Sequence, residues 1–140
     1  DLNMSPGKLA AQVAHASWAF LSNGIRKCMQ TAKFDDYEKK YVFKLRLDKD
    51  IAEEWFGGIF TKTICEAKNK NQLLKAKAIA EENGLVEDVD FFLINDACNT
   101  ELIPEEVDEN GVGRTLTCIG FRPLDDETAW KISKKFQLYK

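Results

Sequence analysis

This 140-residue chain has few residues that bind metals, with a single histidine, His15, and four cysteines. The cysteines lie at least 20 residues apart, with no Cys-x-x-Cys pair, at positions Cys28, Cys65, Cys98 and Cys118. Structural zinc sites use soft ligands that are grouped along the sequence, so this spacing predicts no such site. Because no secretory signal is recognisable at the front, we expect reduced thiols and a cytoplasmic protein.

Proline, glycine and long apolar runs are also scarce. Three prolines and eight glycines, with 44% hydrophobic and 31% charged residues, exclude a collagen-like repeat, a disordered tail and low-complexity sequence. The longest uncharged stretch, residues 9–25, contains Gln12, His15 and Asn23. It does not fit a membrane-spanning helix, which needs about 20 mostly apolar residues. We expect one soluble domain covering residues 1–140, with no membrane contact.

Lysines gather in two places, although the net charge is −3. That net charge argues against a protein that coats nucleic acid over its whole surface, but not against a local basic patch. The two groups are Lys33, Lys39, Lys40 and Lys44 in the first half of the chain, and Lys131, Lys134, Lys135 and Lys140 at its end. Each group is either a solvated face or a contact for phosphates, whose affinity would fall steeply with salt.

Helical and extended patterns alternate along the chain. Ser5 is a good N-cap, and Pro6 suits the first position of an alanine-rich helix that reaches about Leu21 and stops at Asn23-Gly24. Strands are predicted at residues 43–47, 61–67, 90–95 and 115–121, and helices at 50–56, 71–82 and 126–136, with Asn71 and Asp125 as caps and an acidic loop at 105–113. This alternation predicts an α/β sandwich.

The first helix has one unusual face. At 100° per residue, Lys8, Gln12 and His15 fall within about 60° of one another. A separate apolar stripe lies roughly a right angle away, made of Leu9, Val13, Ala16 and Phe20. One face can therefore pack on a core while its neighbour presents a cation, an amide and an imidazole in a line. The alternative is that Lys8 is a surface charge, Gln12 is solvated and His15 bonds a nearby strand.

The start of the same helix is a second candidate. Its unpaired N–H groups, the helix dipole and Lys8 together suit a phosphate or a carboxylate, and Gly7 lets a ligand approach the backbone. Most helix starts, however, bind only water.

Polar residues follow the buried strand at 90–95. Asp96 and Thr100 lie just beyond its end, where α/β proteins usually place ligand chemistry, and could orient a water or bind a ribose. An Asx turn that stabilises its own backbone is the alternative. Thr115 and Thr117 share one face of the next strand and either supply further hydroxyls or are ordinary strand residues.

Several segments resemble one known family. Residues 7–16, GKLAAQVAHA, are similar to the Gly-Lys-x-Ala-Ala-Gln-x-x-His-Ala signature of the archaeal/eukaryotic-type (type II) peptidyl-tRNA hydrolases. Asp96-Ala97 with Thr100 resembles the family's Asp-Ala-Gly-Arg-Thr, and Thr115 with Ile119-Gly120 resembles its Thr-Val-x-Ala-Ile-Gly-Pro. Residues 134–139 are similar to its last segment, so the resemblance covers nearly the whole chain in order.

The resemblance implies a fold, a reaction and a set of site residues. The fold is a three-layer α/β/α sandwich around a mixed sheet of about four strands, commonly in a homodimer. The reaction is hydrolysis of the ester of peptidyl-tRNA in the cytoplasm, with tRNA as partner and with no cofactor or metal. From this resemblance and the patterns above, the expected catalytic residues are Lys8, His15, Asp96 and Thr100, and the expected substrate-binding residues are Gly7, Gln12, Thr115, Thr117, Lys131, Lys134 and Lys135.

Within that set the roles stay open. Either Asp96 or His15 orients or deprotonates water, Lys8 meets the oxyanion or a phosphate, and the threonines donate hydrogen bonds. Two other functions are compatible with the sequence: a D-aminoacyl-tRNA deacylase-like esterase and a non-catalytic module that binds tRNA or another protein.

The chain also departs from the family pattern. Cys98-Asn99 replaces Gly-Arg, and Glu101 replaces Gln. The family's strand lysine aligns with Glu66, although Lys62 and Lys68 flank it. Residues 25–60 and 105–113 are longer than usual, and the strand with which the family begins is missing from this sequence, which starts at Asp1-Leu2. These differences predict a divergent branch.

Overall fold

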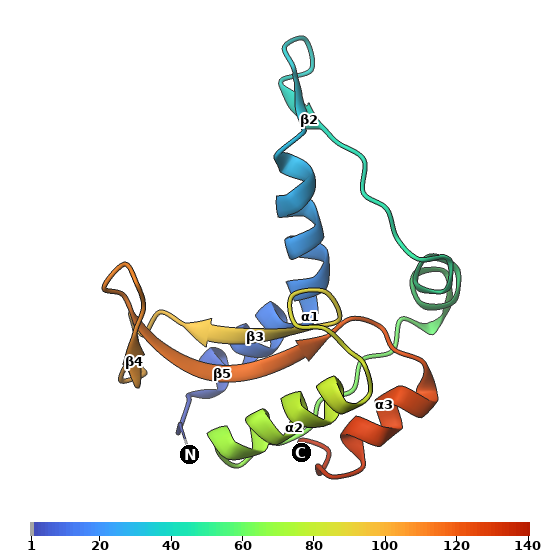
Figure 1. Cartoon of the computed structure of the whole chain (residues 1–140). Helices are drawn as coiled ribbons and strands as arrows, with labels where there is room; N and C mark the ends of the chain where they lie inside the picture. The colour runs from blue at the N-terminus through green and yellow to red at the C-terminus, as the bar shows by residue number, and fades with distance from the viewer. Residues whose placement is uncertain (1) are drawn as a thin grey trace. The chain divides into compact units, whose positions relative to one another are not determined.

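The computed structural model describes residues 2–140 and divides into two compact units (Figure 1). Unit 1 extends to Phe20 and resumes at Thr63, and unit 2 comprises Leu21–Lys62. The division falls inside the first helix, α1 (Pro6–Met29). No helix among residues 2–140 is long and apolar enough to cross a membrane.

Unit 1 is built on a three-stranded antiparallel sheet in the order β3-β5-β4. The strands are β3 (Phe91–Asp96), β5 (Gly113–Phe121) and the short β4 (Glu106–Val107). Between Ile94 and Asn95 the register shifts, because their partners on β5 are Cys118 and Leu116. Thr117 is therefore the extra residue of a β-bulge, a feature that re-aims a side chain.

Helices cover both faces of β3 and β5. The helices α2 (Lys70–Glu82) and α3 (Asp126–Ser133) lie together on one face (Figure 1), where Ala80, Phe91 and Ile132 form a buried cluster. The first part of α1 crosses the other face at Gly120, where a Cβ atom would overlap the backbone of Ala16. The alternation of the strand residues explains the two faces, since adjacent side chains point in opposite directions.

Unit 2 contains the end of α1 and two further features. A two-stranded antiparallel hairpin pairs β1 (Lys33–Asp35) with β2 (Lys40–Val42), and a short π-helix, η1, follows at Ile51–Ile59. Inside this unit the Cys28 thiol donates to the Lys44 carbonyl at 3.1 Å.

Much of the expected secondary structure is confirmed. The α/β class, the start of α1 at Pro6, the strands β3 and β5, and the end of α2 all match the sequence pattern. Asp125 caps α3 by accepting a hydrogen bond from the Thr128 N–H. The sheet differs from the one expected. The family resemblance implied a mixed sheet of about four strands, whereas every named strand pair among the described residues is antiparallel.

Four local predictions were wrong. Helix α1 passes through Asn23-Gly24, where Gly24 serves packing: a Cβ there would meet Leu45 at 3.1 Å. The cap of α2 is Asn69, which accepts from the Gln72 N–H, and not Asn71. Residues 43–47 and 61–67 are not strands, since only one bridge, Cys65 with Leu138, forms there. Alternation marks extended backbone, but a strand also needs a neighbour to pair with.

Candidate active site

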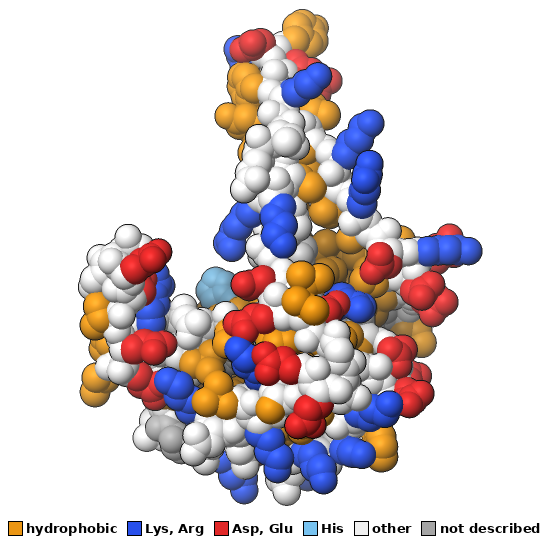
Figure 2. Space-filling model, viewed as in Figure 1, with side chains coloured by type: hydrophobic (Ala, Val, Ile, Leu, Met, Phe, Trp, Pro, Cys, Tyr) orange, Lys and Arg blue, Asp and Glu red, His pale blue; other side chains and the backbone are white. Residues whose placement is uncertain are grey.

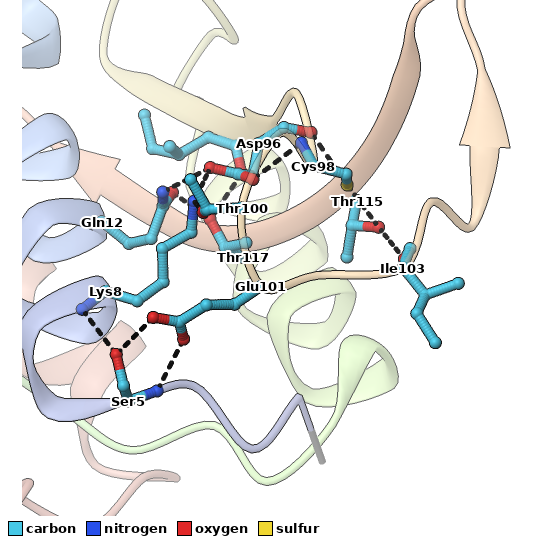
Figure 3. A network of polar contacts seen from close by, with 11 residues as sticks. Ser5, Lys8, Gln12, Asp96, Cys98, Thr100, Glu101, Ile103, Thr115 and Thr117 are labelled. Atoms are coloured by element: carbon cyan, nitrogen blue, oxygen red, sulfur yellow. Dashed lines mark hydrogen bonds and ion pairs between the residues drawn. The ribbon is translucent and has the colours of Figure 1, made fainter.

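A partly buried ion pair joins the start of α1 to the end of β3. Lys8 Nζ lies 2.7 Å from Asp96 Oδ2, and the two side chains are only 13% and 11% exposed (Figure 3). Gln12 Nε2 donates to the same carboxylate oxygen at 2.7 Å. Lys8 and Gln12 are four residues apart, so they share one face of the helix and reach the same group. The sequence-predicted helix face and strand end are therefore one site.

A second bond fixes the orientation of Gln12, which is 2% exposed. The Thr117 hydroxyl donates to Gln12 Oε1 at 2.6 Å and lies 3.0 Å from the Ile94 carbonyl oxygen. Because an ionised carboxylate can only accept, the Gln12 amide must point its NH₂ group at Asp96 and its oxygen at Thr117. The β-bulge that holds Thr117 thus aims the amide.

Asp96 stays ionised in this setting. Burial would raise the pKa of Asp96, but hydrogen bonds from Lys8, the Cys98 N–H and Gln12, together with the Lys8 charge, outweigh it and lower the pKa. Among residues 2–140, Oδ2 receives two donors, whereas Oδ1 receives only the Cys98 N–H at 2.8 Å. A carboxylate oxygen has two lone-pair sites, so the acceptor capacity that is left lies at Oδ1.

The loop after β3 is bonded back to α1. Lys8 Nζ donates to the Thr100 hydroxyl at 3.2 Å. Glu101 accepts from the Ser5 N–H at 3.0 Å and from the Ser5 hydroxyl at 2.6 Å. Ser5 Oγ in turn accepts from the Lys8 N–H at 3.3 Å. A carboxylate of the chain itself therefore occupies the helix start at which the sequence suggested an external anion.

Thr115, on β5, anchors the loop through hydrogen bonds. It is fully buried, donates to the Ile103 carbonyl at 2.9 Å and accepts from the Glu105 N–H at 3.1 Å. The Cys98 thiol also lies 3.4 Å from its hydroxyl. Thr115 thus supports the loop and does not present its hydroxyl to solvent.

His15 and Gly7 lie outside this network. His15 is on the same helix, but its side chain is exposed (Figure 2) and forms no hydrogen bond or ion pair within residues 2–140. Gly7 is exposed, and a Cβ there would meet nothing within 4 Å, so the backbone is open to a ligand.

The lysines of the last helix are partly engaged. Lys131 Nζ lies 2.7 Å from Glu127 Oε1, and Lys134 Nζ lies 4.2 Å from the centre of the Trp130 ring. Lys135 is exposed and has no ion pair with any residue that the structure describes.

The candidates for the family's strand lysine do not join the network. Lys62 belongs to unit 2, where it lies 3.3 Å from the centre of the Phe60 ring. Glu66 bonds the Gln137 carbonyl through its backbone, and Lys68 is exposed. Within residues 2–140, no group of three or more His, Cys, Asp or Glu side chains could hold a metal ion.

Sequence reasoning missed the Ser5–Glu101 contact and the role of the bulge. The available signal for the first was the replacement of the family's Gln by Glu101. The bulge at Thr117 left no signal, because it depends on how β3 pairs with β5.

Comparison with known proteins gives one consistent result. Residues 1–139 match the family described as "Peptidyl-tRNA hydrolase PTH2". A peptidyl-tRNA hydrolase from Thermococcus sibiricus is 31% identical over 142 aligned positions, covering 99% of this chain and 89% of that protein. One from Methanopyrus kandleri is 33% identical over 91% of this chain and 80% of its own length. One from Thermoplasma acidophilum is 26% identical, over 99% and 90%.

Proposed function

The chain belongs to the peptidyl-tRNA hydrolase PTH2 family, so its reaction is hydrolysis of the ester bond of peptidyl-tRNA, and we propose that the Lys8–Asp96 network carries it out. The observation that carries this proposal is the arrangement of Lys8 and Gln12 around one ionised carboxylate at a strand end. The atoms that act on the substrate are those with a donor or acceptor position that the network itself does not use.

Lys8 supplies the positive charge. Its ammonium group has three N–H donors, of which one meets Asp96 and one meets Thr100. The third is available for the ester carbonyl oxygen, which becomes negative as water adds to the carbonyl carbon. A fixed donor in a nearly buried site stabilises such an oxyanion far better than one in water.

Asp96 orients the attacking water through Oδ1. A carboxylate with a lowered pKa is a weak base, so it accepts a hydrogen bond from water more readily than it takes the proton outright. The water oxygen bonds to the carbonyl carbon, and one of the water protons passes to the ribose oxygen. The bond between the carbonyl carbon and that oxygen then breaks, which leaves a carboxyl group on the peptide and a hydroxyl group on the ribose. Thr100 hydrogen-bonds the substrate. His15 contacts the substrate from the helical turn that follows Gln12.

Substrate contacts extend the site. Gly7 leaves room beside Lys8 for the end of tRNA, and Lys131, Lys134 and Lys135 meet its phosphates. Three buried side chains hold the catalytic groups in position and do not contact tRNA: those of Gln12, Thr115 and Thr117. On the family resemblance, the protein acts in the cytoplasm and forms a homodimer. Sedimentation of the purified chain tests whether it is a dimer.

The deciding experiment compares substrates and variants. We expect release of N-blocked amino acid from N-blocked aminoacyl-tRNA and little release from D-aminoacyl-tRNA. Lys8→Ala and Asp96→Asn should each lower turnover about a hundredfold or more while the protein still binds tRNA and stays folded. Preference for D-aminoacyl-tRNA would establish the deacylase, and tRNA binding without turnover would establish a binding module. Wild-type rates in a folded Asp96→Asn protein would show that the carboxylate is structural.

A further inference from the structure

The β1–β2 hairpin of unit 2 exposes three aromatic rings. Phe34 and Tyr41 are cross-strand partners with ring centres 5.0 Å apart, and they remain 46% and 58% exposed. Tyr37, in the turn between the strands, is 96% exposed. Rings of this size are usually buried, so a cluster of them at the surface of a hairpin indicates a binding surface.

The turn that carries Tyr37 is ordered by its own hydrogen bonds. Asp35 Oδ1 accepts from the Tyr37 N–H and from the Glu38 N–H, each at 2.9 Å. Lys39 then takes a left-handed conformation with φ of 56° and closes the turn. The Tyr37 ring is therefore presented on a fixed backbone, which lowers the entropy lost when a ligand binds it.

The charge around the rings is positive. Residues 26–46 contain seven Lys or Arg and three Asp or Glu, a net of +4 in a chain whose net charge is −3. Lys33, Lys44 and Arg46 form no ion pair with any residue that the structure describes. Figure 2 shows Lys and Arg side chains beside hydrophobic ones over this unit.

Exposed aromatic rings and unpaired cations together match the chemistry of unpaired nucleotides. Bases stack on aromatic rings whatever their sequence, and lysines neutralise the phosphates between them. A protein partner fits less well, because lysine is depleted at the centre of protein interfaces.

We propose that the surface formed by residues 26–46 binds unpaired nucleotides of the tRNA substrate. Tyr37 and the Phe34–Tyr41 pair stack on bases, and the free cations Lys33, Lys44 and Arg46 meet phosphates. The proposal rests on the proposed function for the identity of the RNA, and the tests below separate the two.

The first test measures binding of deacylated tRNA to the full chain by fluorescence anisotropy. Tyr37→Ala should weaken binding about fivefold or more, whereas Tyr37→Phe, which keeps the ring, should bind like the wild type. The difference between the two variants should disappear with an RNA duplex that has no unpaired nucleotides. Equal binding of tRNA by Tyr37→Ala and the wild type would overturn the proposal.

The second test measures the salt dependence of the same binding. Lys33→Gln and Lys44→Gln should each lower the slope of log affinity against log salt by about one. The matched control is Lys75→Gln, an exposed lysine of α2 in unit 1, which should leave the slope unchanged. Slopes that fall no more in the two hairpin variants than in the control would overturn the proposal.

Separate measurements distinguish the two hypotheses. If the wild type binds tRNA without hydrolysing N-blocked aminoacyl-tRNA, and Tyr37→Ala weakens that binding, the proposed function fails and the binding surface stands. If Tyr37→Ala and Tyr41→Ala bind tRNA normally but sediment as smaller species than the wild type, the surface joins two copies of the chain, and the proposal fails.

Discussion

Glu101 is hydrogen-bonded to Ser5 across 96 positions of the sequence, through both the backbone N–H and the hydroxyl of the serine. This contact connects the loop after β3 to the first turn of α1. The pKa of Glu101 is lowered by the Ser5 hydroxyl and the Ser5 N–H, so the carboxylate remains charged at neutral pH. The loop that carries Thr100 is therefore held against the helix that carries Lys8.

Removing this contact should slow the reaction more than it weakens the fold. In Glu101→Ala the loop loses its anchor and Thr100 moves away from Lys8, and small misplacements of reacting groups lower rates by up to about a hundredfold. Glu101→Gln, which restores the residue typical of the family, keeps one acceptor for Ser5 and should retain most of the activity. Steady-state kinetics with N-blocked aminoacyl-tRNA, beside thermal unfolding, make the comparison. Equal kcat values for Glu101→Ala and Glu101→Gln would contradict a positioning role.

The ionisation of Asp96 predicts how stability depends on pH. A carboxylate whose pKa is lower in the folded state stabilises the fold above its unfolded pKa, near 4, and the stabilisation is lost as pH falls through the folded value. The free energy of unfolding of the wild type should therefore decline below about pH 4. The decline should be shallower in Asp96→Asn, because that variant has no proton to take up at this position. Urea unfolding at a series of pH values tests it, and parallel curves for the two proteins would show that Asp96 does not contribute.

The parts of the site that were predictable are those set by local spacing. Lys8 and Gln12 share a helix face because they are four residues apart, and Asp96 follows an apolar strand. Local spacing therefore places both halves of the candidate site, and the structure brings them together. The contact of Ser5 with Glu101 depends on tertiary packing, which leaves no mark in local periodicity. The cap of α2 was misplaced by two residues because Asn69 and Asn71 are equally good caps in sequence.

Unit 2 was harder to predict because its short strands depend on one local turn. Residues 43–47 alternate more regularly than residues 33–42, yet only the latter form a hairpin. Asp35 makes the difference by bonding two N–H groups of the turn. The two hairpin strands then pair, whereas residues 43–47 have no strand beside them among the described residues.

Thr117 should be worth more to stability than a typical strand threonine. Thr117→Val removes the hydroxyl that donates to Gln12 Oε1 and takes from this buried amide oxygen its partner among the described residues, at a cost of about 1–3 kcal/mol. Thr117→Ser keeps the hydroxyl and should lose less. Turnover should also fall in Thr117→Val, because Gln12 is then free to turn its amide away from Asp96. The free energy of unfolding in urea measures the first effect. A Thr117→Val protein as stable as Thr117→Ser would show that the hydrogen bond to Gln12 contributes nothing measurable to stability.

The last prediction concerns the lysines of α3, which are not equally available to tRNA. Lys131 is paired with Glu127, so a phosphate must compete with a carboxylate of the same helix, whereas Lys135 has no such competitor among the described residues. Lys135→Gln should therefore lower the salt slope of tRNA affinity by about one, and Lys131→Gln by less. Glu127→Gln removes the competing charge and should tighten tRNA binding.

The predicted gain in tRNA affinity for Glu127→Gln makes the test specific. A variant that had merely lost part of its fold would bind tRNA less tightly, not more tightly. Lys75→Gln on α2 serves as the control for a change of net charge alone. Anisotropy titrations of deacylated tRNA at several salt concentrations give the slopes of the wild type and of the four variants. If Glu127→Gln binds tRNA no more tightly than the wild type and Lys135→Gln no less tightly, the charged face of α3 is in contact with water only, and the phosphates of tRNA must be held by cations elsewhere in the chain.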